Sequence, residues 1–246
     1  MKALVALELN RLAVEDVELA PPQAGEVRVR MKAAGVCHSD LSVVNGTVPM
    51  PLPMVLGHEG AGIVETVGPG VTRVAAGDHV VLSFVPNCGE CWFCVRQEPH
   101  LCVRCDAGGR MWDGTSRLKL RGQELGAMSQ LGCLAQYAVV PAASVMPIDR
   151  TIPFDCAALV GCAVMTGVGA VTNTAQVEAG STVAVFGCGG VGLAAIQGAR
   201  LVGAKQIIAV DLADNKLEYA RSFGATHCVK ASDGVVAEVQ ALTQGL

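Results

Sequence analysis

The sequence predicts an α/β protein in two parts: a strand-rich, irregular domain followed by an incomplete doubly wound parallel sheet. Short β-branched runs separated by Gly and Pro fill the chain up to about residue 160. After that point apolar strands alternate with helical segments, which is typical of parallel βαβ units. A glycine-rich turn joins the first of these strands to its helix. These three observations predict a β-rich domain followed along the chain by a sheet of the nucleotide-binding type.

The first part, residues 1–160, is predicted from four strand-like runs bounded by turn residues. They are Glu26–Met31, Gly62–Val67, His79–Ser83 and Tyr137–Val140. Within this part, residues 86–104 are rich in cysteine and carry Pro and Gly, so this lobe has little apolar core of its own. We expect a bound metal to supply its folding energy.

The second part, residues 161–246, alternates strands and helices. Strands are expected at 182–186, 206–210 and 226–229, and helices at 191–202, 215–223 and 235–242. A complete doubly wound dinucleotide fold has about six strands, twice the number that fit here. We therefore expect either a fragment of a longer protein or a sheet edge that another segment must cover.

Composition narrows the class of protein. The chain has 246 residues, 51% of them hydrophobic and 16% charged, with a formal charge of -4, which excludes disorder, collagen and a nucleic-acid-binding tail. Two windows without charges, Cys156–Val177 and Ala179–Ala199, are long enough to span a membrane. Their polar residues and glycines favour buried α/β elements instead. Because Glu8 interrupts the apolar start, a signal peptide is disfavoured, and we expect a soluble cytoplasmic protein with reduced thiols.

The glycine-rich turn has the spacing of a dinucleotide-binding loop. Gly187, Gly189 and Gly192 form G-x-G-x-x-G directly after an apolar strand, with Gly190 and Val191 opening the helix. The first glycine permits a tight turn, the second a close approach of the pyrophosphate, and the third close helix–strand packing, while the helix N-terminus supplies free N–H groups. The alternative is an ordinary glycine-rich turn.

An acidic residue follows at the position that selects the coenzyme. Asp211 stands nineteen positions after Gly192, at the end of the next predicted strand. A carboxylate there accepts a hydrogen bond from a ribose 2′-hydroxyl and repels a 2′-phosphate, so NAD is favoured over NADP. The alternative is a surface aspartate without a ligand.

Four cysteines in one short stretch predict a closed metal site. Cys88, Cys91, Cys94 and Cys102 offer four thiolates, the number that a tetrahedral structural zinc needs. Iron–sulfur ligation is the rival, because sets of four thiolates also hold clusters. With all four positions filled, no position remains for a substrate.

Further motifs give the chain a family resemblance. GVCHSD, GHEGAGIVETVG, GDHVVLSF, the cysteine lobe, GCAVMTG and VFGCGGVG occur in the order found in the zinc-containing medium-chain alcohol dehydrogenases, which the chain resembles from its N-terminus to Leu246. The resemblance implies a GroES-like catalytic domain and the first half of a Rossmann coenzyme domain. It also implies two zinc ions per chain and NAD, used to oxidise an alcohol or to reduce an aldehyde.

The resemblance assigns a second, open zinc site. In this family the matching residues, Cys37, His58 and Cys162, hold a catalytic zinc whose fourth position is left for water or substrate, the arrangement known for alcohol dehydrogenase. Each of these cysteines taken alone would be read as a buried thiol. Sequence spacing alone does not bring the three residues together.

Several neighbours take roles by the same resemblance. Asp40 is expected to hydrogen-bond a ring nitrogen of His58 and fix its tautomer. Glu59 is expected behind the metal, Ser39 at the start of a proton path towards the coenzyme ribose, and His38 facing the pyrophosphate.

The remaining assignments concern the coenzyme and the substrate. Thr166 is expected to approach the nicotinamide, and Lys216 to join Asp211 at the adenosine ribose. Phe84 is expected to line the substrate pocket; the alternatives are a core side chain for Phe84 and a solvated charge for Lys216. Ser42 stands where many relatives end the proton path in histidine, and serine does not take up a proton near neutral pH.

Two rival functions stay open. One is oxidation of an S-(hydroxymethyl)thiol, the formaldehyde adduct of a thiol, on the same machinery. The other is a non-catalytic zinc- and dinucleotide-binding fragment; zinc-free quinone reductases are disfavoured by the open ligand set. Residues 113–126 resemble the insertion of the dimeric branch, which includes thiol-formaldehyde dehydrogenases and bacterial enzymes assayed with a nitroso acceptor.

The predicted partners are a small alcohol or aldehyde, with no nucleic acid and no membrane. In this family the subunits pair through coenzyme-domain strands, so the parent protein is expected to be a homodimer or homotetramer, whereas residues 1–246 alone are not expected to form the usual dimer. The other cysteines with no assigned role are expected to be small buried hydrophobes: Cys105, Cys133, Cys156, Cys188 and Cys228.

Overall fold

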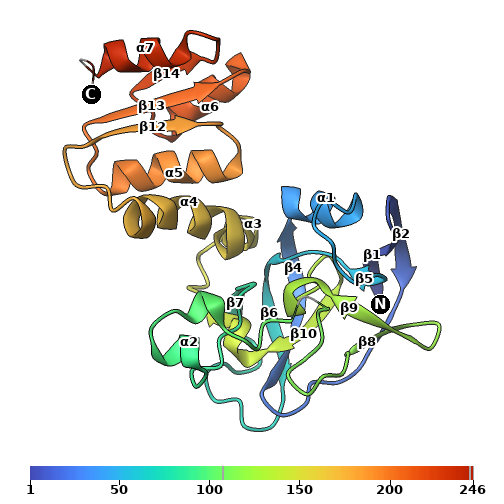
Figure 1. Cartoon of the computed structure of the whole chain (residues 1–246). Helices are drawn as coiled ribbons and strands as arrows, with labels where there is room; N and C mark the ends of the chain where they lie inside the picture. The colour runs from blue at the N-terminus through green and yellow to red at the C-terminus, as the bar shows by residue number, and fades with distance from the viewer. Residues whose placement is uncertain (107, 244, 246) are drawn as a thin grey trace. The chain divides into compact units, whose positions relative to one another are not determined.

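The computed structural model divides into two compact units, Met1–Cys162 and Ala163–Leu246 (Figure 1). It describes residues 1–106, 108–243 and 245. The first unit is built mainly of strands, and the second alternates strands with helices. This pattern confirms the α/β class predicted from the sequence.

The first unit contains two sheets. One has the strand order β2-β1-β5-β9-β8-β3, and the other has the order β10-β4-β6-β7-β11. The strands of the first sheet are β1 (Lys2–Glu8), β2 (Arg11–Asp16), β3 (Glu18–Leu19), β5 (Met54–Val55), β8 (Leu118–Leu120) and β9 (Gln123–Ala127). Those of the second are β4 (Glu26–Gly35), β6 (Glu59–Val67), β7 (His79–Leu82), β10 (Tyr137–Pro141) and β11 (Val145–Pro147).

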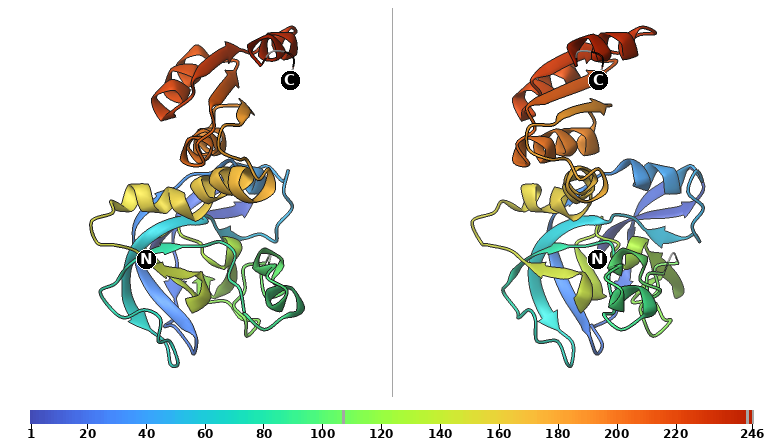
Figure 2. Two further views of the ribbon diagram at one scale, coloured as in Figure 1. Left: turned by 90° about the vertical axis from the view of Figure 1, so that its left-hand side faces the viewer. Right: turned by 60° about the vertical axis from the view of Figure 1, so that its left-hand side comes forward.

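Alternation along β4 shows why the second sheet forms where it does. Val27 and Val29, which point to one face of the strand, are fully buried, whereas Arg30, which points to the other face, is exposed. The inward residues meet Val64 of β6 and Leu82 of β7 in one apolar cluster. β4 and β6 run side by side as the two long, curved strands of Figure 2. Both extend further than the sequence pattern predicts, as far as Gly35 paired with Glu59, and this extension ends beside the candidate metal centre.

Helices in the first unit are short. They are α1 (His38–Val44), α2 (Trp92–Val95) and α3 (Phe154–Leu159), with 3-10 turns at η1 (Pro99–Leu101), η2 (Met128–Gln130) and η3 (Ala142–Ser144). After α3 the backbone widens into the π-helical segment η4 (Val160–Val164). Such widened turns recur at functional sites, and this one carries Cys162.

A buried ion pair fastens residues 113–126 to the first unit. These residues contain the β8–β9 hairpin, whose two-residue turn at Arg121 and Gly122 has positive φ at both positions, as a tight hairpin requires. Arg117 donates to both carboxylate oxygens of Glu26, at 2.9 and 2.6 Å, and to Asp113 at 2.6 Å. Arg117 and Glu26 are nearly inaccessible to water, so this contact is a buried link between residues 113–126 and β4.

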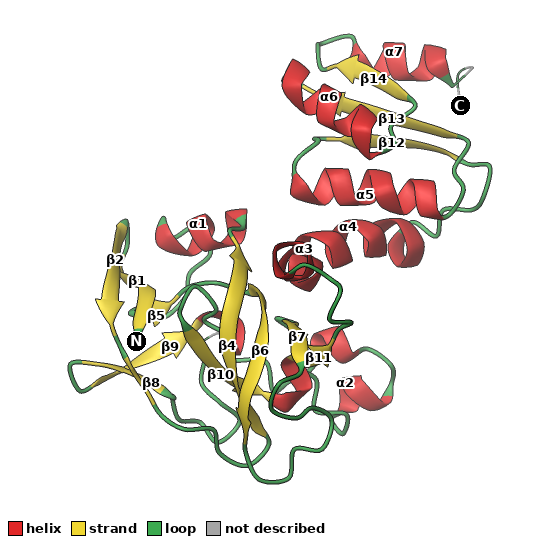
Figure 3. Cartoon of the chain, turned by 180° about the vertical axis from the view of Figure 1, so that it is seen from behind, coloured by secondary structure: helices red, strands yellow, loops and turns green. Residues whose placement is uncertain are grey.

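The second unit contains a three-stranded parallel sheet in the order β12-β13-β14 (Figure 3). The strands are β12 (Thr182–Phe186), β13 (Gln206–Asp211) and β14 (His227–Lys230), and the helices are α5 (Gly190–Leu201), α6 (Asp214–Phe223) and α7 (Val235–Leu242). Ile207 packs with α5 and α6, and Ile208, the next residue, packs beneath α7. The sheet is therefore covered on both faces, as expected for parallel βαβ units.

The second unit begins with α4 (Met165–Gly169) and the π-helical segment η5 (Ala170–Thr174). Glycines allow α4 to lie close to α5, since a Cβ on Gly167 would stand 2.4 Å from the Val191 carbonyl oxygen. The helical stretch Phe154–Thr174 is long and apolar enough, by length and composition alone, to cross a membrane. The window Ala179–Ala199 instead forms the β12–α5 unit, as the sequence predicts.

Candidate metal centres and dinucleotide loop

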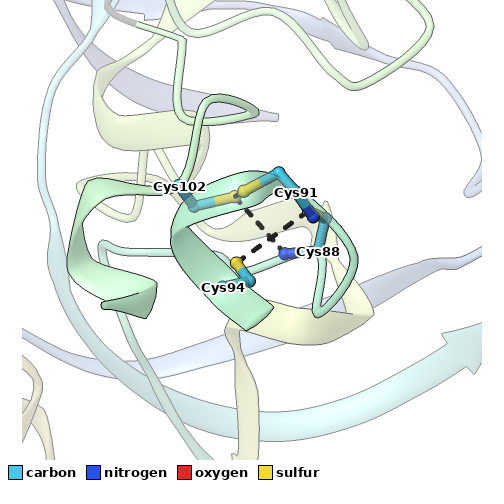
Figure 4. Close-up of side chains that lie close together, drawn as sticks. All are labelled: Cys88, Cys91, Cys94 and Cys102. Carbon is cyan, nitrogen blue, oxygen red and sulfur yellow. Dashed lines mark hydrogen bonds between the residues drawn. The ribbon is translucent and has the colours of Figure 1, made fainter. Parts of the chain in front are cut away.

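Four thiols converge in the lobe at residues 88–102 (Figure 4). The Sγ atoms of Cys88 and Cys94 are 4.0 Å apart, and so are those of Cys91 and Cys102. A tetrahedral zinc with Zn–S bonds of about 2.3 Å separates its sulfurs by ~3.8 Å. The spacing of the thiols therefore fits a zinc ion without rearrangement of the loop.

Backbone N–H groups prepare these sulfurs for negative charge. The N–H groups of Cys94 and Val103 lower the pKa of Cys91 to about 6. Burial and the neighbouring thiols raise the pKa of Cys94 to about 12. Four adjacent thiols therefore do not all ionise by themselves, and a divalent cation compensates the charge.

A second group of donors forms at the end of the β4–β6 pair. The ligand atoms of Cys37, His58, Glu59 and Cys162 all lie within 4.8 Å of one another, although the residues are far apart in sequence. Cys37 caps α1, His58 directly precedes β6, Glu59 is the first residue of that strand, and Cys162 lies on η4. Two thiols and an imidazole, with a carboxylate beside them, are a donor set that suits zinc.

Glycines permit this convergence. A Cβ on Gly35 would stand 2.0 Å from an oxygen of the Glu59 carboxylate, so the side chain of Glu59 occupies the space that a side chain at position 35 would need. A Cβ on Gly161 would stand 2.4 Å from the Leu82 carbonyl oxygen, and this close approach brings η4 against β7. The glycines beside the ligands are therefore part of the construction of the site.

Asp40 lies between the segments that carry two of the donors. Its carboxylate accepts hydrogen bonds from the backbone N–H groups of Cys37, at 2.9 Å, and Gly57, at 3.1 Å. The same carboxylate lies 3.5 Å from Nδ1 of His58, the ring nitrogen to which the resemblance assigns it. Asp40 thus fixes the two segments that carry Cys37 and His58, and its role in setting the tautomer of His58 stays a prediction.

The site concentrates negative charge around the imidazole. Burial lowers the pKa of His58, but Asp40 and Cys162 raise it more, to about 11. Burial raises the pKa of Cys37, but hydrogen bonds from Ser39 and His58 lower it more. A bound dication is stabilised by the same negative groups that favour a charged imidazole here.

The other residues assigned to the first unit lie around this centre. The Sγ of Cys37 lies 3.7 Å from the hydroxyl of Ser39, next to His38, which is exposed. Phe84 is half-buried, and its ring contacts that of His58 edge-on with 5.9 Å between centroids. Ser42 is half-buried on α1. The roles assigned to Ser39, His38 and Phe84 stay predictions.

The dinucleotide loop of the second unit has the backbone that its spacing predicts. Gly187 has φ +91°, and its N–H donates to the carbonyl of Val210 at 2.8 Å. A Cβ on Gly192 would stand 1.9 Å from the Gly187 carbonyl oxygen, so the third glycine is required for the close packing of α5. Gly189 has open space where a side chain would be, which leaves its backbone accessible to a phosphate. Gly190 and Val191, at the start of α5, are exposed.

Asp211 lies at the carboxyl end of β13, beside this loop. Its carboxylate accepts hydrogen bonds from the N–H of Cys188, at 2.7 Å, and of Ala213, at 3.0 Å, which lower its pKa. A carboxylate has about four acceptor positions, so others remain for a ribose hydroxyl. Lys216 is half-exposed, with its ammonium group 3.9 Å from Asp211, and Thr166 is exposed on α4.

The cysteines without an assigned role do not all follow the expectation. Cys133 and Cys188 are buried and Cys228 is half-buried, but Cys105 and Cys156 are exposed. The expectation was wrong for these two: Cys105 directly follows the four-cysteine lobe, Cys156 lies on the short helix α3, and both are exposed to solvent.

The sheets, the two donor sets and the glycine loop together agree with the family resemblance of the sequence. Residues 23–150 match the family model of the alcohol dehydrogenase GroES-like domain, and residues 190–246 match that of the zinc-binding dehydrogenases. The chain is 49% identical over 245 residues to "Alcohol dehydrogenase class-3" of Myxine glutinosa, covering 97% of this chain and 65% of that protein. It therefore spans slightly less than two thirds of this curated relative.

Solved structures agree with this assignment. A zinc-binding domain protein of the alcohol dehydrogenases from Burkholderia ambifaria superposes with a TM-score of 0.93 at 38% identity, over 99% of this chain and 68% of its own. Benzyl alcohol dehydrogenase from Acinetobacter calcoaceticus gives 0.91 at 34% identity, over 99% of this chain and 67% of its own. The chain belongs to the zinc-containing medium-chain alcohol dehydrogenase family, which confirms the resemblance, and members of this family are generally soluble.

Proposed function

We propose that the protein is a zinc-dependent alcohol dehydrogenase that transfers hydride between a small alcohol, or the aldehyde in reverse, and NAD. The observation that carries this proposal is the convergence of Cys37, His58 and Cys162 beside Glu59, with their ligand atoms within 4.8 Å. Two thiolates and one imidazole leave a fourth position of a zinc ion open, as catalysis requires.

Each metal site has its own set of residues. Cys37, His58 and Cys162 would hold the catalytic zinc, and the four cysteines of the lobe would hold a structural one. When bound, the catalytic zinc supplies Lewis-acid chemistry that lowers the pKa of an alcohol hydroxyl. Asp40 keeps the backbone around two of the ligands in place, and we assign to the Ser39 hydroxyl the first hydrogen bond from the departing proton.

The second unit would bind the coenzyme. The N–H groups at the start of α5 would hold the pyrophosphate, and Asp211 would select NAD because its negative charge repels a 2′-phosphate. We further propose that residues 1–160 form the catalytic domain and 161–246 the first half of the coenzyme domain. The division of the chain after Cys162 supports that boundary. A cytoplasmic location and a homodimeric or homotetrameric parent protein, without a nucleic-acid or membrane partner, complete the proposal.

One relative favours a second substrate class. The similarity to a protein named alcohol dehydrogenase class-3 keeps oxidation of an S-(hydroxymethyl)thiol adduct as the alternative. A non-catalytic zinc- and dinucleotide-binding role is the other alternative, but a half-open ligand set has no purpose in such a protein.

Metal analysis and thiol titration test the proposal. Zinc per chain is measured by elemental analysis on metal-dialysed protein, and NADH binding and NAD reduction with small primary alcohols are measured on the same sample. We expect two zinc ions, one after Cys37→Ser, and two after the control Cys105→Ser, which changes an exposed thiol outside both donor sets. A single zinc with Cys37 and Cys162 still titratable, or two zinc ions without NADH binding, would contradict the proposal.

A further inference from the structure

A second ion pair lies near Asp211, at the carboxyl edge of the sheet in the second unit. Nζ of Lys230 is 2.6 Å from the carboxylate of Asp214. The neighbouring pair of Asp211 and Lys216 has a longer contact, 3.9 Å from Nζ to the carboxylate. Within the described part of the chain, the side chains of Asp214 and Lys230 bond only to each other. This second pair has no role in the proposed function.

The register of the parallel strands places Lys230 next to Asp211. In the pairing of β13 with β14, Lys230 is opposite Asp211, and Val229 is opposite Val210. The two valines pack in the cluster beneath α7. Because successive residues of a strand point to opposite faces, Asp211 and Lys230 both point to the face that α5 and α6 cover. Neighbouring strands are about 4.8 Å apart, so the long side chain of Lys230 starts within reach of groups around the Asp211 carboxylate.

The turn after β13 fixes Asp214 at the same edge of the sheet. The carboxylate of Asp211 accepts a hydrogen bond from the N–H of Ala213 at 3.0 Å, and Asp214 follows as the first residue of α6. Asp214 is therefore held close to the carboxylate that is proposed to bind the adenosine ribose. Two carboxylates and two ammonium groups share this edge, so their formal charges cancel.

A coenzyme with a 2′-phosphate needs an available cation at this edge. The phosphate adds about −1.5 to −2 charges to the ribose, and proteins bind such groups with cations and N–H donors. Lys230 has the position for this contact, and its side chain is 60% exposed, so it can turn towards a bound group when no carboxylate holds it. While Asp214 holds the ammonium group, the charge of that cation is neutralised and its donors are directed to α6.

We propose that Asp214 is a positioning residue for coenzyme selection, which holds Lys230 away from the ribose 2′ position and so helps to exclude NADP. Asp211 acts directly, because its charge repels a 2′-phosphate. Asp214 acts through Lys230, because it occupies the cation that would otherwise compensate this repulsion. The inference rests on the dinucleotide part of the proposed function, which places the adenosine ribose beside Asp211.

Binding of two nucleotides tests the inference without requiring turnover. Adenosine 5′-monophosphate carries the ribose 2′-hydroxyl, and adenosine 2′,5′-bisphosphate carries a phosphate there; calorimetry gives the dissociation constant of each on the zinc-loaded chain at low ionic strength. We expect the unmodified chain to prefer the monophosphate. Asp214→Asn is expected to shift the ratio of the two constants towards the bisphosphate by at least about fivefold, because Lys230 is released. Added salt is expected to reduce this shift, since exposed charges are screened.

Further variants assign the shift to the released lysine. The double variant Asp214→Asn with Lys230→Met is expected to return the ratio to within about twofold of the parent value, and Asp214→Glu to keep that value because it retains a carboxylate. The control Glu218→Gln removes the same charge from an exposed position of α6 and leaves the ratio unchanged.

The variants keep the thermal stability of the parent chain, because both side chains of the pair are exposed, 60% for Lys230 and 72% for Asp214. An unchanged ratio in Asp214→Asn overturns the inference. A shift that persists without Lys230, or an equal shift in Glu218→Gln, also overturns it. So does an unmodified chain that binds neither nucleotide or that prefers the bisphosphate.

Failure of this inference differs from failure of the proposed function. Zinc content and NADH binding on the same sample depend on the donor sets and on the glycine loop, and not on Asp214. A chain with two zinc ions and bound NADH whose ratio does not respond to Asp214→Asn retains the proposed function and loses only this inference. A ratio that responds as expected in a chain with fewer than two zinc ions retains the inference and contradicts the proposed function.

Discussion

Replacing Arg117 by Met tests whether a buried ion pair holds residues 113–126 in place. Arg117 is 5% exposed and makes two parallel bonds to the carboxylate of Glu26, which is 6% exposed. The substitution keeps much of the side-chain volume and leaves the Glu26 carboxylate buried without its cation. The Glu26 carboxylate also accepts a hydrogen bond from the N–H of Gln23, but this neutral donor does not neutralise the charge of the carboxylate.

The expected loss of unfolding free energy follows from the burial of the Arg117–Glu26 ion pair. Removing one partner of a buried pair costs ~3–5 kcal/mol of unfolding free energy, because the remaining charge stays in a low-dielectric site. The pair with Asp113 adds little, since the Asp113 side chain is 41% exposed and solvent screens it. The double variant Arg117→Met with Glu26→Gln removes the uncompensated charge and regains at least about half of the loss. The matched control Arg121→Met breaks an ion pair whose arginine is 79% exposed and costs ~1 kcal/mol or less.

Urea unfolding of the zinc-loaded chain measures these differences. Both tryptophans, Trp92 and Trp112, lie in the first unit, so tryptophan fluorescence reports on its unfolding. The midpoint and slope of each unfolding curve give the free energy of unfolding of the parent chain and of each variant.

Asp113 makes the stability of the first unit depend on pH. Hydrogen bonds from Arg117 and from the N–H of Thr115 lower its pKa to about 2, so its contribution is complete above about pH 4 and is lost as the pH falls towards 2. A loss of less than ~1 kcal/mol for Arg117→Met at pH 7, or no recovery in the double variant, would refute the buried-charge argument.

Four further predictions concern the ligand sites. Gly189→Ala is expected to leave thermal stability unchanged, because a Cβ there meets no atom within 4 Å, yet to weaken NADH binding at least about tenfold in calorimetry; unchanged affinity would contradict the phosphate-loop role. Asp211→Asn is expected to lower the NADH-to-NADPH affinity ratio at least about tenfold, since the charge that repels a 2′-phosphate is lost, and an unchanged ratio would count against it. Cys94→Ser is expected to release the lobe zinc and lower the melting temperature of the first unit, as chelation does, whereas Cys105→Ser retains both; a variant that keeps two zinc ions would exclude Cys94 as a ligand. Ser42→His is expected to shift the pH profile of hydride transfer by adding a group that titrates near neutral pH, and an identical profile would show that the proton leaves by another path.

Local sequence signals predicted the elements that depend on local chemistry. The strand at 182–186 and the helix at 235–242 have the predicted bounds, because apolar runs between Gly and Pro leave little choice of register. The four-cysteine lobe was also visible in sequence, since its ligands occupy one short loop. Boundaries shifted where tertiary pairing extends a strand, as in β4, which continues to Gly35 because Glu59 pairs with it.

The family order of motifs, rather than spacing, pointed to the open metal site. Cys37 is a helix cap, His58 lies just before a strand and Cys162 lies on a π-helical turn, and only the folded chain brings them together. The backbone partners of Asp40 could not be predicted for the same reason, because the N–H groups of Cys37 and Gly57 come near its carboxylate only in the folded chain.

The sequence by itself determined the class of fold, the glycine loop and the four-cysteine lobe, because turn conformation, hydrophobic period and thiolate chemistry are properties of the residues themselves. The tertiary structure alone decided which donors meet and which cysteines are exposed. These facts depend on contacts between residues far apart in the chain, and burial and hydrogen-bond partnership are properties of such contacts rather than of any single segment.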